Sequence, residues 1–165
     1  MRAEASVVIR APIEVVFDYV IEPSTIHEWQ GTALYARLET DRPFRVGSRT
    51  VETRKFLGQR LESAMEVTEL DPPYRFAIRV IEGPVPVGAV VDVSVEPDGT
   101  TRVDWVIEGE SRGFFRLAEP IVERVMEREL RHSIETMRDL LEARHGFDDD
   151  GPFELAQAGS TGLAD

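Results

Sequence analysis

The stretch "PIVERVMERELRHSIETMRDLLEAR", Pro120 to Arg144, decides the fold because it predicts one long amphipathic helix. It contains no glycine, and no proline after its first residue. At 1.5 Å per residue such a helix would extend about 37 Å. Its apolar residues form a single stripe at helical spacing: Ile121, Val122, Val125, Met126, Leu130, Ile134, Met137 and Leu141. A narrow stripe on an otherwise charged helix predicts a helix that lies in a groove.

The segment before this helix supplies a surface for it, because it predicts six β-strands in succession. We expect strands at residues 32–40, 46–56, 60–70, 74–82, 86–96 and 100–109. The connections are short and contain turn residues, as in "EPDGT", where Asp98-Gly99 favours a tight hairpin. Parallel strands need longer crossovers, so the pattern predicts an antiparallel meander.

Apolar and charged residues alternate along these strands, which predicts one buried and one solvated face. The expected buried residues are Leu61, Met65, Val67, Tyr74, Phe76, Ile78, Val80, Val87, Ala89, Val91, Val93, Val95, Val103, Trp105 and Ile107. The expected solvated residues are Glu62, Glu66, Arg75, Arg79, Asp92, Arg102 and Asp104. The register of the strands at 32–40 and 46–56 stays open, because neither face of residues 49–54 is clearly apolar.

The N-terminal residues predict a strand followed by two short helices. Apolar residues alternate from Ala3 to Arg10, as in a half-buried strand. Pro12 suits the first turn of a helix, and "IEVVFDYVI" continues with helical spacing. Pro23 would end this helix, and Ser24 or Thr25 could cap a second, shorter helix that ends before Gly31. The whole pattern is typical of an α+β domain.

Composition limits the classes of partner and compartment. The 165 residues carry 31 carboxylates against 19 basic side chains, a formal net charge of -12, which disfavours nucleic acid and anionic membranes. No cysteine is present, so disulfides and thiolate sites are excluded. No apolar run approaches the roughly 18 residues of a membrane span, and the N-terminus lacks a signal-peptide core, so we expect no membrane insertion and a cytoplasmic protein. Residues 1–144 are expected to form one domain and residues 145–165 an acidic, disordered tail.

The order of elements resembles the START-like superfamily, also called Bet v 1-like or SRPBCC, and in particular its polyketide cyclase/dehydrase and lipid-transport branch. The resemblance covers residues 1–144 and rests on Ala11-Pro12 with Val16-Phe17, on Trp29, on Val46-Gly47 and on "EVTELDPPYRFAIR" from Glu66 to Arg79. It implies a helix-grip fold, a curved six- to seven-stranded antiparallel sheet wrapped around a long C-terminal helix, with two short helices after the first strand. It also implies an apolar cavity between sheet and helix.

Other motifs give little support for metal, nucleotide or serine chemistry. "GESRG", from Gly109 to Gly113, matches a nucleophile elbow, but no parallel βα units precede it, so we interpret it as a turn between strand and helix. The three histidines are far apart in sequence and no phosphate-binding glycine loop occurs. We therefore expect no catalytic Ser111, no metal site and no cofactor.

The cavity implied by the resemblance would be lined by apolar and aromatic residues. The candidate ligand-binding residues are Trp29, Tyr35, Met65, Phe76, Ile78, Val91, Val93, Trp105, Phe114, Phe115, Val122, Met126 and Leu130. Phe114 and Phe115, just before the long helix, would plug one end of the groove. The same aromatic residues could instead fill a compact core, because aromatic side chains dominate both environments.

Three functions remain open from the sequence. The leading hypothesis is binding of a small hydrophobic or aromatic molecule. The second is a cyclase or dehydratase that uses the same cavity, with a buried acid or base among Tyr35, Glu52, Ser63 and His132. The third is a partner-binding regulatory domain whose groove is filled by side chains. An anionic ligand would need Arg49 or Arg54, and the oligomeric state, monomer or homodimer, is left open.

Overall fold

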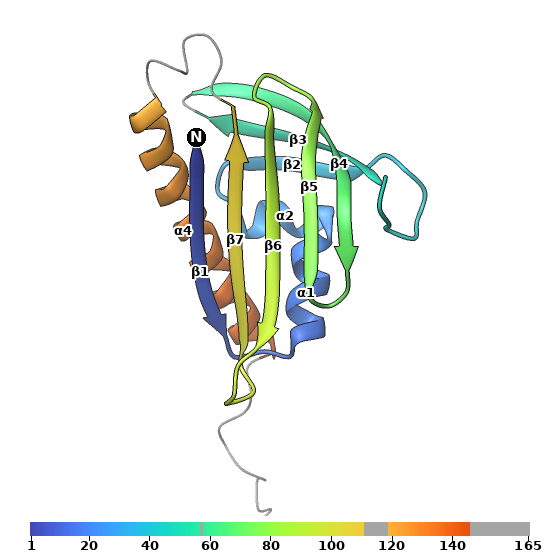
Figure 1. The fold of residues 1–165 in the computed structure, drawn as a ribbon, viewed down its shortest axis with the longest axis vertical. Coiled ribbons are helices and arrows are strands. Elements are labelled where there is room, and N and C mark those ends of the chain that lie inside the picture. The colour runs from blue at the N-terminus through green and yellow to red at the C-terminus, as the bar shows by residue number, and fades with distance from the viewer. Residues whose placement is uncertain (57, 111–118, 146–165) are drawn as a thin grey trace, which may run out of the picture.

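The computed structural model describes residues 1–56, 58–110 and 119–145, which form one seven-stranded antiparallel sheet with helices against it (Figure 1). The strands are β1 (Arg2–Ile9), β2 (Ala33–Leu38), β3 (Arg49–Phe56), β4 (Gln59–Asp71), β5 (Arg75–Glu82), β6 (Val87–Val95) and β7 (Thr101–Gly109). Their order in the sheet is β1-β7-β6-β5-β4-β3-β2. The predicted strands and the meander from β2 to β7 are therefore confirmed, and β1 pairs with β7.

The helices are α1 (Ile13–Ile21), the short 3-10 helix η1 (Pro23–Thr25), α2 (Ile26–Trp29) and α4 (Glu119–His145). Pro12 stands at the N-cap of α1, as its fixed φ allows. Thr25 stands at the N-cap of α2, but its hydroxyl donates to the carbonyl oxygens of Tyr19 and Glu22. It therefore ties η1 to the end of α1 instead of capping α2.

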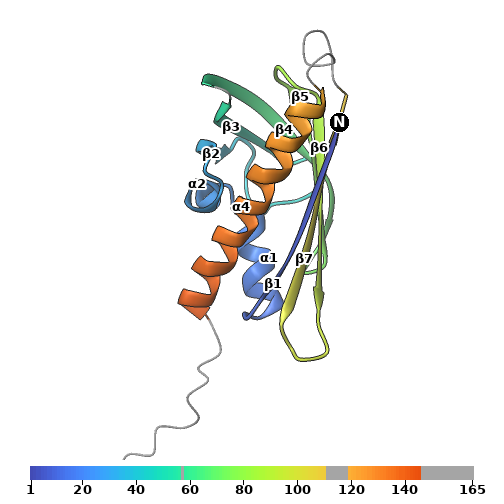
Figure 2. The ribbon, with the colours of Figure 1, turned by 90° about the vertical axis from the view of Figure 1, so that its left-hand side faces the viewer.

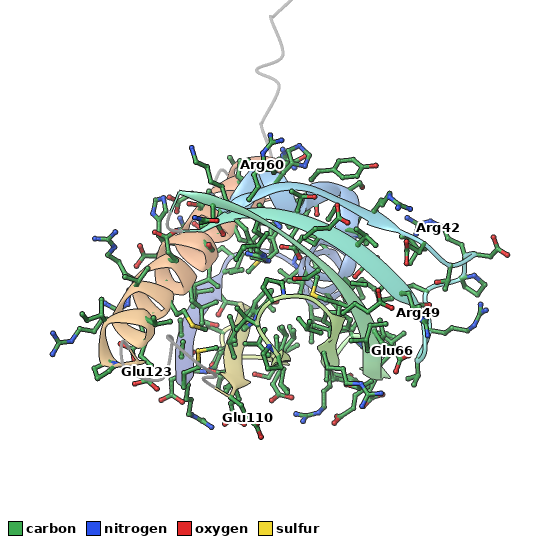
Figure 3. The ribbon with its side chains drawn as sticks, turned by 90° about the horizontal axis from the view of Figure 1, so that it is seen from above. Arg42, Arg49, Arg60, Glu66, Glu110 and Glu123 are labelled. Atoms are coloured by element: carbon green, nitrogen blue, oxygen red, sulfur yellow. The ribbon has the colours of Figure 1, made fainter. Side chains whose placement is uncertain are left out.

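The sheet is strongly curved and α4 runs across its concave side (Figures 2 and 3). The helix contacts β1 most extensively and also touches α2. Ile134, Met137 and Leu141 of its apolar stripe are fully buried, in one core with Phe17 of α1 and Val91 of β6. This arrangement confirms the predicted helix-grip fold.

The two faces of the sheet differ as the alternation predicted. On the outer face Arg79 lies 3.0 Å from Glu66, and Arg75 pairs with both Glu69 and Asp92. Figure 3 shows Glu66 and Arg49 pointing away from the concave side. Such exposed pairs contribute little to stability individually, but their charged side chains face solvent on this side of the sheet.

Three predicted buried positions are wrong. Tyr74 belongs to the turn before β5 and is 54% exposed, while Val95 is the last residue of β6 and is 57% exposed. Ile121, in the first turn of α4, is 68% exposed. All three stand at the end of an element, where the alternating or helical pattern continues in sequence but the opposing layer no longer covers it.

Some predictions fall outside the described residues. They concern Ser111, the proposed plug of Phe114 and Phe115, and the acidic tail after His145. Among the helices that are described, none is both long enough and apolar enough to cross a membrane.

Candidate ligand-binding site

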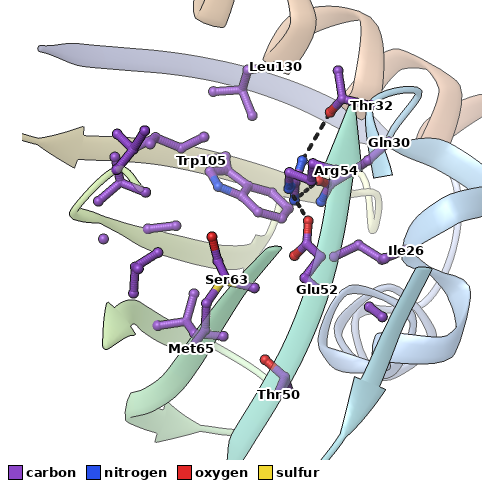
Figure 4. Close-up of a pocket in the computed structure, with 18 of the residues that line it drawn as sticks. Ile26, Gln30, Thr32, Thr50, Glu52, Arg54, Ser63, Met65, Trp105 and Leu130 are labelled. Carbon is purple, nitrogen blue, oxygen red and sulfur yellow. Dashed lines mark hydrogen bonds and ion pairs between the residues drawn. The ribbon is translucent and has the colours of Figure 1, made fainter. Parts of the chain in front are cut away.

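A pocket of about 280 Å³ lies between the concave face of the sheet and α4. Strands β3 to β7 form its floor, α4 forms one wall, and α1, η1 and α2 close another side (Figure 4). The turn between β5 and β6, Pro84 to Pro86, contributes to its rim. Most of the lining is apolar, and the volume lies just below the range of about 300–1,000 Å³ typical of small-molecule sites.

Seven of the sequence-predicted site residues line this pocket. They are Met65, Phe76, Ile78, Trp105, Val122, Met126 and Leu130. They come from β4, β5, β7 and α4, so the pocket wall is assembled from elements distant in the chain. Their position on the wall is a property of the structure, and their contact with a ligand stays a prediction.

Three other candidates are buried in the core and do not line the pocket. Trp29 is 1% exposed and packs its ring against Trp105 at 5.3 Å between centroids, with the planes tilted by 60°. It therefore supports the wall that Trp105 forms. Val91 and Val93 of β6 are buried in the core farther from the pocket. These residues fill the compact interior, which was the alternative that the sequence left open.

Among the candidates that the structure describes, only Tyr35 faces solvent, with 56% of its surface exposed. The pairing of β2 with β3 shifts register between Ala33 and Tyr35. Because this irregularity adds a residue between the buried positions Ala33 and Ala36, both Leu34 and Tyr35 turn outward. The prediction that Tyr35 lines the cavity is therefore wrong.

Three polar side chains of β3 face the pocket. Thr50, Glu52 and Arg54 alternate along the strand and all line the pocket, while Arg49 lies on the other face, 4.0 Å from Glu66. Glu52 lies opposite Ser63 of β4, which is also on the pocket wall. The structure thus resolves the register that the sequence left open. His132, the remaining polar candidate, is exposed on α4 and is not part of the lining.

Arg54 is held in place by three partners. Its Nε forms an ion pair with Glu52, its Nη2 donates to Oε1 of Gln30, and its Nη1 donates to Oγ1 of Thr32 at 3.2 Å (Figure 4). Each guanidinium nitrogen therefore has one partner, two through hydrogen bonds and one through the ion pair. The sequence showed no signal for Gln30 or Thr32, because both lie in the irregular segment between α2 and β2.

Glu52 is the most deeply buried charged residue of this group, with 2% of its surface exposed. Neither carboxylate oxygen accepts a hydrogen bond of regular geometry from any described residue, although one oxygen is paired with Arg54. The hydroxyl of Thr50 and the indole N–H of Trp105 also lack a hydrogen-bond partner within the described part of the chain. A buried polar atom without a partner is costly, so these atoms mark a place for an incoming polar group.

Further carboxylates lie around the pocket. Glu22 and Glu129 are in its lining, as is Glu110. Partial burial raises the pKa of the Glu22 carboxyl, but hydrogen bonds donated by Arg42 and Ser24 outweigh this effect and leave the pKa below its usual range. Glu22 is thus ionised at neutral pH. Among the described residues, Arg54 contributes the only basic side chain to the lining, so the carboxylates outnumber it there.

The fold agrees with the comparisons to known proteins. The family model described as polyketide cyclase/dehydrase and lipid transport matches residues 1–142. No curated protein matches. Among solved structures, a protein from Thermus thermophilus has 17% identity and a TM-score of 0.75, with 87% of this chain and 99% of that chain covered.

Two further structures have comparable similarity. The Zhui aromatase/cyclase from Streptomyces sp. R1128 has 15% identity and a TM-score of 0.73, with 87% of this chain and 94% of that chain covered. A START superfamily protein from Mycobacterium smegmatis has 11% identity and a TM-score of 0.72, with coverage of 87% and 98%. At these identities the similarity concerns the fold.

Proposed function

This chain belongs to the polyketide cyclase/dehydrase and lipid transport family, and on that premise we propose that it binds a small hydrophobic or aromatic molecule in the pocket between sheet and α4. The observation that carries the proposal is the pocket itself, about 280 Å³ of space with a mostly apolar wall. Burial of apolar surface is the main source of affinity in such a site.

The sequence alternative of a partner-binding domain predicts a groove filled by side chains. Among the described residues the groove contains open space instead, which favours a small molecule as the occupant. Met65 and Met126 in the wall can adapt to related ligands, because methionine side chains are flexible.

The first experiment is native mass spectrometry of the protein purified from cells, followed by denaturing extraction to identify any bound compound. We expect an apolar molecule at near-stoichiometric occupancy. Titration with the neutral fluorescent probe N-phenylnaphthylamine adds a direct measurement, in which one saturable site is expected.

A pair of neighbouring variants locates the site. Ala89 lines the pocket, and Val90 points to the opposite face of β6. Ala89→Trp should fill the pocket and abolish probe binding, whereas Val90→Trp adds the same side chain outside it and should leave binding intact. Equal binding by both variants, with circular dichroism showing that both are folded, would refute the proposal.

A second candidate function is catalysis of a cyclase or dehydratase type in the same pocket. Glu52 favours it, because an ionisable group buried beside a bound keto compound can act as a general base. The similarity to the Zhui aromatase/cyclase is consistent with this candidate. The test is cyclisation or dehydration of a poly-keto thioester by the purified protein, and Glu52→Gln should lower the rate by about a hundredfold or more.

A further inference from the structure

The polar end of the pocket specifies the kind of ligand, and this step rests on the proposed binding function. We infer that the ligand is an electrically neutral apolar molecule that carries a hydroxyl group, and that the hydroxyl donates a hydrogen bond to the Glu52 carboxylate with Thr50 beside it. The inference follows from which polar atoms of the wall have partners and which do not.

The Glu52 carboxylate is an acceptor that the described residues leave incompletely satisfied. Arg54 pairs with one of its oxygens, and neither oxygen accepts a regular hydrogen bond. Figure 4 shows the carboxylate directed toward Arg54, with Ser63 and Trp105 on the neighbouring part of the pocket wall. Since an ionised carboxylate can only accept, the matching ligand group must be a donor.

Thr50 adds a second contact on the same face of β3. Its side chain is buried, with 4% exposed, and its hydroxyl has no partner among the residues that the structure describes. Thr50 and Glu52 are two residues apart on one strand, so their side chains are neighbours on the pocket side. A ligand hydroxyl has a donor for Glu52 and an oxygen that can accept from Thr50, whereas an ether or a hydrocarbon has no donor for Glu52.

The charges of the lining disfavour an anionic ligand, and the Arg54 guanidinium disfavours a cation directly at the Glu52 carboxylate. A cationic amine would approach Arg54, whose guanidinium stands next to the Glu52 carboxylate. A carboxylate ligand would meet Glu52 in a lining that also contains Glu22 and Glu129, and Arg54 is already paired with Glu52, Gln30 and Thr32. The sequence suggestion that Arg54 would serve an anionic ligand is thus not favoured by its surroundings. A neutral donor avoids both repulsions.

Three probes of nearly equal size separate a neutral donor from a neutral acceptor and from an anion: β-naphthol, its methyl ether and β-naphthoate. Isothermal titration calorimetry with the full-length protein at neutral pH would measure their affinities. We expect β-naphthol to bind about tenfold or more tightly than the ether, as for a hydrogen bond to a charged acceptor, and naphthoate to bind most weakly.

Variants test whether the Glu52 carboxylate and the Thr50 hydroxyl cause the preference for naphthol over its methyl ether. Glu52→Gln should reduce the naphthol-to-ether ratio about tenfold, and Thr50→Val, which changes neither charge nor size, should reduce it severalfold. Thr50→Val also covers the case in which Glu52→Gln does not fold because Arg54 loses its pair. Glu62→Gln, on the exposed face of β4, is the matched control and should leave the ratio unchanged.

The outcomes distinguish this inference from the function on which it rests. If the ether binds as tightly as naphthol, or naphthoate binds most tightly, and Ala89→Trp still excludes all three, then the pocket binds ligands but the inference is wrong. A ratio that is unchanged in both Glu52→Gln and Thr50→Val also overturns it. If none of the three probes binds, the proposed function fails together with the inference.

Discussion

At the scale of single residues, Tyr19 joins three helices at a surface remote from the Glu52 end of the pocket. Its phenol donates a hydrogen bond to Oε2 of Glu28 in α2 at 2.8 Å. Arg144, near the end of α4, donates to the same oxygen at 2.9 Å and lies over the Tyr19 ring at 5.8 Å from its centroid. The three side chains fasten the end of α4 to α1 and α2.

The ionisation of Tyr19 gives a prediction for alkaline pH. Burial, followed by the hydrogen bond to Glu28, raises the pKa of the Tyr19 phenol from 10.0 to about 12. A raised pKa means that the folded state favours the neutral phenol. Its contribution to the free energy of unfolding is therefore complete below pH 10 and is lost as the pH rises through about 12.

Near-ultraviolet absorbance titration of the folded protein tests this prediction. One tyrosine should ionise with a midpoint near 12, and this phase should be missing in Tyr19→Phe. Unfolding in urea at several pH values should show the corresponding loss of stability in the wild type only. If the ionisation near pH 12 is still present in Tyr19→Phe, it does not belong to Tyr19 and the prediction is wrong.

The orientation of single side chains is the part of the structure that the sequence predicted least well. The sequence correctly predicted that Trp105, Phe76 and Leu130 line the pocket, because apolar alternation in strands and apolar spacing in a helix indicate which side chains are buried. Tyr35 was misplaced because a bulge in β2 is not visible as a change in residue type. The sequence does not show whether Glu52 points toward the pocket or toward solvent. The buried side of β3 is itself polar, so hydrophobic periodicity gives no signal there.

At the scale of elements, the stripe of α4 carries much of the core. Ile134 is completely buried in this stripe, whereas Ile121 is mostly exposed on the same helix. Ile134→Ala should lower the free energy of unfolding by about 2–5 kcal/mol, because it removes buried methyl groups and leaves a cavity. Ile121→Ala is the control and should change it by less than about 0.5 kcal/mol. Chemical denaturation of both variants measures the difference, and similar losses would argue against the burial described for α4.

The hairpin between β6 and β7 depends on the backbone conformation of Gly99. This residue has φ of +85°, and Asp98 accepts hydrogen bonds from the backbone N–H and the hydroxyl of Thr100. An added Cβ would meet no atom within 4 Å, so the cost of Gly99→Ala comes from the backbone alone. We expect a loss of about 1–2 kcal/mol in the free energy of unfolding.

Gly31 provides the matched control for that substitution. An alanine Cβ there also meets no atom within 4 Å, and the residue does not adopt a positive φ. Gly31→Ala should therefore be neutral or slightly stabilising, because alanine restricts the unfolded chain. Thermal and urea unfolding of the two variants give the comparison, and an equal effect would show that the strain at Gly99 is absent.

Elements were predicted better than residues because each is supported by many positions at once. The strand at 60–70 corresponds to β4, although β4 contains two register shifts, since most of its alternation survives them. The long helix follows from eight apolar positions, so the exposure of Ile121 does not disturb it. Errors therefore gather at the ends of elements and at bulges.

At the scale of the whole molecule, ligand binding should stabilise the fold. The pocket wall combines β3 to β7 with α4, so a bound molecule has contacts that exist only when these layers are packed together. At a free ligand concentration of 100 Kd, the free energy of unfolding should rise by about 2.7 kcal/mol. Differential scanning calorimetry with the tightest naphthalene probe measures this as an increase in Tm.

The variants Ala89→Trp and Val90→Trp serve as controls for this calorimetric experiment. Val90→Trp should retain the increase in Tm and Ala89→Trp should lose it, because only Ala89 lines the pocket. A ligand-dependent increase in both variants would place the stabilising site elsewhere on the molecule.

The pairing of β1 with β7 has a consequence for how this protein is made. Ala5 lies opposite Trp105, so the first strand finds its partner only after about a hundred further residues have been synthesised. Until β7 leaves the ribosome, β1 has no neighbour in the sheet, and α4, which packs mainly on β1, follows later still. A chain synthesised only as far as β6 therefore lacks the part of the pocket wall that β7 and α4 supply, and the complete pocket requires both.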